Sequence, residues 1–335
     1  MKKAICILLI FVCFFLTACD KEEERGKIPI IGGDAEAWID VSALSKETNL
    51  ATVLAVTPEE EVLLYTEEGA VLRAKAGAYF LSSKGEIRNN EGRYGSLLGV
   101  IENPPTAMIA DVADIAFAAL NAGEKVLILY LDGFGYDSYV EALGEGILPN
   151  LSQLAAQKAA TVYPSITPVT YSAMISGETP DLTGVQSRDD HMLACETVFD
   201  KAIAMGKTTQ IVEGWLQIIV LAGEVSFNSD GNGDGSTDDE VFADAMEKIT
   251  QDPDLLLVHF HGIDDVSHIY GPHSTEALAA IAENDRMARE LLSLWSGRVI
   301  VVADHGQHKV EEDGVTRGEH GEFCASDIFI PLLQN

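Results

Sequence analysis

Three apolar runs in this chain of 335 residues end in acidic or imidazole side chains, and this pattern constrains the fold most strongly. The run VLILYL is followed by Asp132, LLLVHF precedes Asp264 and His268, and VIVVA is followed by Asp304 and His305. Such β-branched, apolar runs are typical of strands that are buried on both faces. Because parallel strands end at one edge of an α/β sheet, we expect these side chains to share one cleft.

From residue 106 onward, helical and strand patterns alternate. We expect helices near 107–122, 148–157, 202–205, 239–250 and 274–295, and strands at 125–131, 207–214, 255–261 and 298–304. Repeated β-α units predict an α/β domain over 106–335, with a largely parallel sheet and helices on both faces.

Residues 34–105 follow a different pattern. Short strand-like runs at 52–56, 61–65, 70–74 and 78–82 are separated by turn-rich segments. Such spacing predicts a small antiparallel meander, and therefore a β-rich N-terminal region. It contains no cluster of metal-ligand residues.

The first residues have the features of an export signal. A charged start is followed by the apolar run 4–16, which ends in LTAC and resembles a bacterial lipobox. We expect a signal peptide over 1–18, lipidation of Cys19 and a tether over 19–33, which would anchor the protein to the outer face of a bacterial cell membrane. The alternatives are an ordinary cleaved signal or an uncleaved anchor.

The overall charge narrows the range of partners. With 53 acidic and 22 basic residues, the formal net charge is -31. No basic surface is evident for nucleic-acid phosphates. A small anionic substrate remains compatible, because bound metal ions reverse the local field. Outside the signal and Cys19 only Cys195 and Cys324 remain, and we favour buried free thiols over a disulfide.

The Asp and His residues are suited to metal binding. Carboxylates and imidazoles are ligands for zinc and also serve manganese and iron. Asp264 and His268 are four residues apart, so both can reach one ion from a single helical turn. With His320 in the turn GEHGEF, the set is large enough for two ions.

A hydroxyl-bearing turn lies between the first two clusters. In PSITPV, Thr167 precedes Pro168 and an apolar segment, which predicts Thr167 as the N-cap of a helix. A helix N-terminus favours a phosphoryl group. A metal held by Asp132, Asp304 and His305 would make the Thr167 hydroxyl a nucleophile. The alternative is that Thr167 only caps the helix; Ser165 and Thr170 are the fallback nucleophiles.

These segments, in this order, resemble the alkaline phosphatase superfamily, and most closely its type I phosphodiesterase/nucleotide pyrophosphatase branch. The segments are LYLDGFG, YPSITPVTYSAMISGETPDLTGV, DDVSHIYGPHS, ADHGQ and GEHGEF. The resemblance implies a three-layer sandwich with a mostly parallel central sheet, and two zinc ions. Asp132, Thr167, Asp304 and His305 would surround one zinc, and Asp264, His268 and His320 the other.

The resemblance also implies a covalent phosphothreonine at Thr167 that water then hydrolyses. Diesterases of the family commonly have Asn where this chain has Thr170, and many have His-Gly where it has Thr183-Gly184. Thr170 and Arg188 are candidate substrate contacts, and Glu213 is another candidate. Sulfatases need a C/S-x-P-x-R segment, which does not occur here.

A second metal motif is weaker. The segment DGNGDGSTDDE resembles the start of a calcium-binding loop, with Asp230, Asn232, Asp234 and Asp238 as ligands. Its twelfth position is Val241 rather than the expected Glu, and a turn that caps the following helix is the alternative.

Three functions follow from the sequence. The first is a two-metal phosphodiesterase or nucleotide pyrophosphatase that acts on a small phosphate-ester substrate. The second is a phosphomonoesterase or phosphotransferase with the same core. The third, from a different class, is a non-catalytic metal-binding surface lipoprotein.

Overall fold

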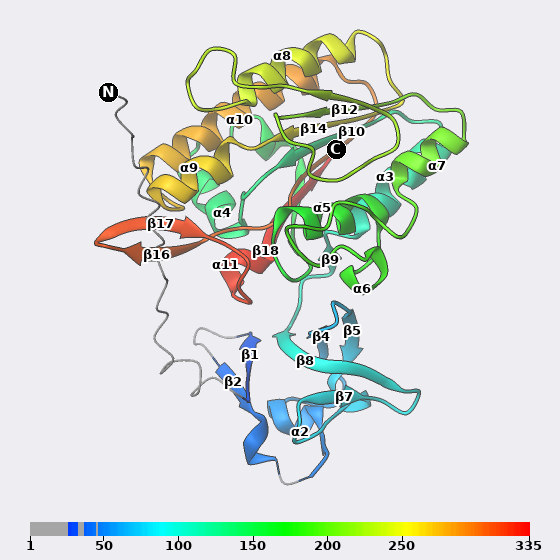
Figure 1. Ribbon diagram of the computed structural model, residues 1–335, viewed down its shortest axis with the longest axis vertical. Helices are drawn as coiled ribbons and strands as arrows, with labels where there is room; N and C mark the ends of the chain where they lie inside the picture. Colours follow the sequence, from blue (N-terminus) through cyan, green and yellow to red (C-terminus); the bar gives the residue numbers. More distant parts are fainter. Residues whose placement is uncertain (1–25, 33–36, 45) are drawn as a thin grey trace, which may run out of the picture.

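The computed structural model describes residues 26–32, 37–44 and 46–335 (Figure 1). The predicted signal peptide, Cys19 and residues 20–25 of the predicted tether lie outside these ranges. Within them, no helix combines the length and the apolar character needed to cross a membrane. Cys195 and Cys324 are both free and partly buried.

The α/β region is built on an eight-stranded sheet. All of its strand pairs are parallel except those that β18 makes with β15 and β11. The strands are, in spatial order, β13 (Glu224–Phe227), β12 (Thr209–Glu213), β14 (Leu255–Phe260), β10 (Val126–Leu131), β15 (Arg298–Ala303), β18 (Phe329–Gln334), β11 (Ala155–Ala160) and β9 (Ala107–Met108). The central strands β10 and β14 are buried along their whole length, as their apolar sequences predict.

Helices cover both faces of this sheet (Figure 1). One layer contains α3 (Asp111–Asn121), α5 (Thr167–Ser176) and α7 (Val198–Ala204). The other contains α4 (Tyr136–Gly144), α8 (Asp238–Ile249) and α10 (Thr275–Leu294), with α9 (Gly262–Tyr270) packed on α10. The predicted three-layer α/β sandwich with a mostly parallel sheet is therefore confirmed. The short helices α6 (Pro180–Thr183) and α11 (Ala325–Ile328) and the hairpin β16 (His308–Glu312)–β17 (Val315–Glu319) complete the region.

The N-terminal region is a smaller, mainly antiparallel assembly, and among its described strands only β1 and β8 pair in parallel. Its elements are β1 (Lys27–Ile31), β2 (Ala37–Asp40), β3 (Thr48–Asn49), α2 (Leu50–Leu54), β4 (Glu61–Thr66), β5 (Val71–Lys75), β6 (Phe80–Leu81), β7 (Glu86–Arg88) and β8 (Arg93–Glu102), with 3-10 turns at Val41–Ala43 and Ala76–Ala78. The predicted strand at 52–56 is wrong. Asn49 accepts a hydrogen bond from the Ala51 backbone N–H and starts α2 there, and Ala55, in the left-handed conformation, ends it.

The predicted helix at 148–157 is also wrong. Only a 3-10 turn forms, at Leu151–Gln153, and the chain then continues as β11. Its Ala and Gln residues favour a helix in isolation. Pairing with β18 on one side and β9 on the other overrides that preference.

The N-terminal sheet packs against the loops that follow the strands of the α/β region. The buried Tyr65 hydroxyl donates to the Thr161 carbonyl over 2.8 Å, and the Tyr65 ring lies edge-on to Phe323 at 5.0 Å. A side chain at Gly99 would meet that Phe323 ring at 2.4 Å, so only glycine permits this approach. Thr161 leads into the Thr167 turn and Phe323 follows His320. The small sheet therefore supports both segments.

Candidate metal centre

Three predicted residues converge on the imidazole of a fourth, His305. Its Nε2 lies 3.1 Å from Asp304 Oδ2, 3.5 Å from Asp132 Oδ1 and 3.5 Å from Thr167 Oγ1. Asp132 follows β10, Asp304 and His305 follow β15, and Thr167 opens α5 after β11. All four side chains are buried. We call these residues the first donor group.

Three more predicted residues form a second donor group beside the first. Asp264 and His268 lie one turn apart on α9, with Asp264 Oδ2 3.2 Å from His268 Nε2. His320 Nε2 lies 3.9 Å from Asp264 Oδ1. The four-residue spacing therefore points both side chains of α9 at one position, as expected for successive turns of a helix.

The two groups are adjacent. The His305 and His320 rings stack with centroids 3.8 Å apart, and ligand atoms of Asp132, Asp264 and His305 lie within 4.8 Å of one another. Gly133 makes this approach possible. It adopts a φ of +70°, and a Cβ there would lie 2.7 Å from Asp264 Oδ1.

The donor atoms fit a metal of zinc type. Four ligands at 2.0 to 2.1 Å from a tetrahedral ion are separated by about 3.3 to 3.4 Å from one another. The donor separations of 3.1 and 3.5 Å in the first group and 3.2 Å in the second are close to that value, whereas the 3.9 Å to His320 is longer. Two carboxylate oxygens in the first group, Asp132 Oδ1 and Asp304 Oδ2, are buried without a hydrogen-bond partner among the described residues. Buried carboxylate oxygens of this kind need either a cation or a proton.

The backbone fixes how the three histidines face this centre. The Nδ1 atoms lie close to carbonyl oxygens, which can only accept a proton: Gly318 for His268 (2.8 Å), Gly306 for His305 (3.1 Å) and Ser165 for His320 (2.9 Å). Each Nδ1 therefore carries the hydrogen. The Nε2 atoms would therefore be the ones that bind a metal, in the arrangement usual for ligating histidines.

The electrostatics of the centre also call for cations. Burial and the negative charge of Asp132 raise the pKa of Asp304 well above its ordinary value. Burial and His305 lower the pKa of His320 to about 4, so that this imidazole is neutral. A hydrogen bond to Asp264 raises the pKa of His268 to about 9, so a metal ion that binds there displaces a proton. Within the described chain, no Lys or Arg forms an ion pair with the three carboxylates.

One local prediction for Thr167 needs correction. The helix α5 begins at Thr167 itself, its N-cap is Ile166, and no side chain caps it. The Thr167 hydroxyl therefore does not serve as an N-cap, and it faces His305 instead. The fallback Ser165 hydroxyl donates to the Glu322 carbonyl at 3.4 Å.

The two predicted substrate contacts are placed differently. The hydroxyl of Thr170, which is fully buried, donates to the Ile166 and Thr167 carbonyls of its own helix. The structure does not bring it to the donor groups. Arg188 does reach them, because its Nη2 lies 3.4 Å from His320 Nε2.

Several residues around the centre were not predicted as metal ligands from the sequence. Gln307 donates from Nε2 to the carboxylate of Asp264. Glu213 ends β12, and His259 and His261 lie at the end of β14, at the same sheet edge as Asp132. Their position after or at the end of parallel strands was the signal that could have identified them.

The predicted calcium loop does not converge on one point. Asp230 accepts hydrogen bonds from the Gly233 and Gly235 backbone N–H groups. Asp238 is buried and accepts from the His261 and Gly262 N–H groups instead. Asp234 accepts from the backbone N–H of Ser236, and Asn232 donates to Asp234 and Asp239. The carboxylates of Asp230, Asp234 and Asp238 are not among the donor clusters found in the described chain.

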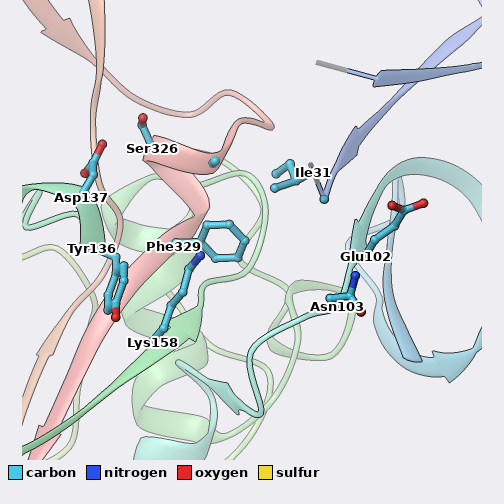
Figure 2. Close-up of a pocket in the computed structure, with 10 residues that line it drawn as sticks. Ile31, Glu102, Asn103, Tyr136, Asp137, Lys158, Ser326 and Phe329 are labelled. Carbon is cyan, nitrogen blue, oxygen red and sulfur yellow. The ribbon is translucent and has the colours of Figure 1, made fainter. Parts of the chain in front are cut away.

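A cavity of about 520 Å³ lies between the N-terminal sheet and the α/β region (Figure 2). Ile31, Glu102 and Asn103 line one side, and Lys158 and Phe329 are among the residues opposite. None of the donor residues lines it. The cavity is therefore separate from the candidate metal centre.

Residues 206–322 match a known family model, described as type I phosphodiesterase / nucleotide pyrophosphatase. The predicted family resemblance is confirmed. The matched stretch includes the whole second donor group, together with Asp304 and His305 of the first. The family is generally metal-dependent, in agreement with the donor groups of this chain.

The individual proteins that this chain resembles are only distantly similar to it. The human GPI ethanolamine phosphate transferase 2, catalytic subunit, is 23% identical over 234 residues, which cover 62% of this chain and 23% of that protein. Phosphonoacetate hydrolase from Sinorhizobium meliloti 1021 is a structural neighbour at a TM-score of 0.46, with 19% identity over 57% of this chain and 58% of that one. Murine ectonucleotide pyrophosphatase / phosphodiesterase 5 also has a TM-score of 0.46, with 16% identity over 56% of this chain and 59% of that one.

The repulsion between buried carboxylates generates a prediction for Asp304→Asn. This variant removes a buried carboxyl group whose ionisation Asp132 opposes, so the metal-free variant should unfold at the same temperature as wild type or at a higher one. Zinc should stabilise wild type by about 2.7 kcal/mol at a hundredfold excess over Kd, and the variant much less. Thermal unfolding with and without zinc measures both effects.

The matched control is Asp313→Asn, at an exposed residue in the β16–β17 turn. It should behave as wild type in both conditions. A zinc-induced rise in Tm of the same size in Asp304→Asn and wild type would contradict the assignment of Asp304 to the centre.

Proposed function

We propose that this protein is a two-metal hydrolase of phosphoric esters, of the phosphodiesterase or nucleotide pyrophosphatase type, with Thr167 as nucleophile. One observation carries the proposal. The Thr167 hydroxyl belongs to the first donor group and lies 3.5 Å from His305 Nε2. Thr167 is also the first residue of α5, a helix that is buried throughout. A hydroxyl among metal-ligand residues at a helix N-terminus is placed for attack on phosphorus.

The donor residues divide into two sets. Asp132, Asp304 and His305 would hold one ion together with Thr167, and the second donor group would hold the other. Zinc fits the mixture of carboxylate and imidazole ligands, and manganese or iron would also be accepted. When bound, the ions supply Lewis acidity that lowers the pKa of a hydroxyl and balances the charge of phosphoryl oxygens.

The protein residues then have defined roles in two displacements. In the first, Thr167 loses its hydroxyl proton to solvent, an Oγ1–P bond forms, and the leaving oxygen departs with its electron pair. In the second, water attacks the phosphothreonine, the Oγ1–P bond breaks, and the threonine hydroxyl is restored. The free N–H groups in the first turn of α5 would bind phosphoryl oxygens in both steps.

Substrate selection depends on the surroundings of Thr167. Arg188 is exposed and lies 3.4 Å from His320, where its guanidinium can bind an outer phosphate oxygen. Thr170 cannot replace the Asn common in diesterases, because its hydroxyl hydrogen is committed to α5. A phosphomonoesterase or a phosphotransferase is therefore the second candidate. The match to a human ethanolamine phosphate transferase favours transfer within that alternative.

The substrate preference and the nucleophile are tested together. The full chain, purified in detergent and loaded with zinc, is assayed on matched aryl phosphate diester and monoester substrates. We expect turnover, with diester preferred. We also expect Thr167→Ala to lose on the order of 10² to 10³ in kcat or more, because the covalent route is removed.

Thr250→Ala, at an exposed threonine after α8, is the control and should retain full activity. Preference for the monoester would assign the protein to the second candidate. Equal turnover by Thr167→Ala and wild type would reject Thr167 as nucleophile. Absence of any turnover by the zinc-loaded wild type would leave the non-catalytic metal-binding lipoprotein.

We also propose that the protein is exported and anchored by lipid at Cys19, on the outer face of a bacterial cell membrane. The support is the charged start, the short apolar run and the LTAC segment. Metabolic labelling with a clickable fatty acid should mark wild type and the control Cys195→Ala, but not Cys19→Ala. Labelling that persists in Cys19→Ala would exclude this anchor.

A further inference from the structure

Asp132 faces donor atoms on two sides. Its Oδ1 points at His305 in the first donor group. Its Oδ2 lies 3.4 Å from His259 Nε2 and 3.4 Å from His261 Nδ1, and neither histidine belongs to the two donor groups. Asp132, His259 and His261 therefore bring three ligand atoms together on the far side of this carboxylate.

The surroundings of His259 orient it as a ligand. Its Nδ1 donates to Glu213 Oε2 over 2.8 Å, and the Tyr171 hydroxyl holds the other Glu213 oxygen over 2.6 Å. His259 also stacks on Tyr130 with ring centroids 4.0 Å apart. A histidine whose Nδ1 is bound to a carboxylate presents an Nε2 lone pair, as in carboxylate–histidine–zinc arrangements.

That lone pair accepts no hydrogen bond from the part of the chain that the structure describes. The His259 side chain is fully buried, and its Nε2 has no hydrogen-bond partner among the described residues. An unpaired nitrogen in this position costs free energy unless something binds it. Asp132 Oδ2 lies 3.4 Å from this nitrogen.

We propose that Asp132, His259 and His261 bind a third metal ion, with Asp132 bridging to the first donor group. The two 3.4 Å separations match the edge of about 3.3 to 3.4 Å of a tetrahedral zinc site. Two imidazoles and one carboxylate select a transition ion such as zinc, manganese or iron rather than magnesium or calcium. The fourth position is open for water.

Access to this site is through His261. The His261 side chain is 18% exposed, while His259 and Asp132 are enclosed. Gly214 lies beside it, and a Cβ there would meet the His261 ring at 3.0 Å. The absence of a side chain at residue 214 leaves His261 room to bind an ion. The alternative occupant of the space is a proton on His261, paired with Asp132 and Glu213.

The experiment counts bound ions. The full chain in detergent is stripped with chelator, loaded with zinc, freed of excess metal and measured by elemental mass spectrometry. We expect three zinc ions per chain in wild type and in the surface control His191→Ala, and two in His261→Ala. Circular dichroism confirms that the variant is folded, and His259→Ala, which should also bind two, provides a second test.

Two zinc ions in both wild type and His261→Ala would overturn the proposal in favour of the protonated histidine. Three ions in both would place the third ion elsewhere and also overturn it. The third site does not rest on the proposed hydrolase activity. Three bound ions without turnover of any phosphate ester would reject the proposed hydrolase but support the third metal site. Two bound ions with turnover would support the hydrolase but reject the third site.

Discussion

Three carboxylates, Asp132, Asp264 and Asp304, meet at the edge of the central sheet beside several imidazoles, and among the described residues no Lys or Arg pairs with them. Like charges repel strongly in a buried, low-dielectric site, so this arrangement needs either cations between the carboxylates or protons on them. The surrounding structure holds the donor side chains in this arrangement. The backbone carbonyls hold the histidine Nδ1 atoms, and Gly133 lets Asp264 approach the strand end.

The N-terminal sheet contributes to the same centre without supplying a ligand. Tyr65 donates a hydrogen bond to Thr161, which precedes the Thr167 turn. Its ring packs against Phe323, which follows His320. Two segments that are distant in sequence are thereby braced by one aromatic residue. We infer that this region positions the candidate site, which explains why its sequence carries no cluster of ligand residues.

Much of the centre was predictable because strand ends and helical turns have simple geometry. The position after β10 or β15 fixes where Asp132 and Asp304 lie, and the four-residue spacing fixes Asp264 and His268. Local predictions failed where longer-range pairing decides the structure, as in the Ala-rich strand β11. The N-cap of α5 is Ile166, one residue before the predicted Thr167, because the exact start of a helix is its least predictable part.

His259 and His261 show more clearly what the sequence alone does not predict. His259 lies on β14 and His261 just after that strand, at the N-cap of α9. Their relation to Glu213 depends on the pairing of β12 with β14, and their relation to Asp132 on the pairing of β10 with β14. Neither register can be derived from a single sequence, so a strand order was needed before the three could be seen as one site.

The central claim is that the buried carboxylates enclose metal ions, and anomalous diffraction tests it most directly. Crystals of the zinc-loaded full chain, measured on both sides of the zinc absorption edge, should show separate anomalous peaks within the first and second donor groups. Ordered donor side chains with no anomalous peak between them would contradict the account.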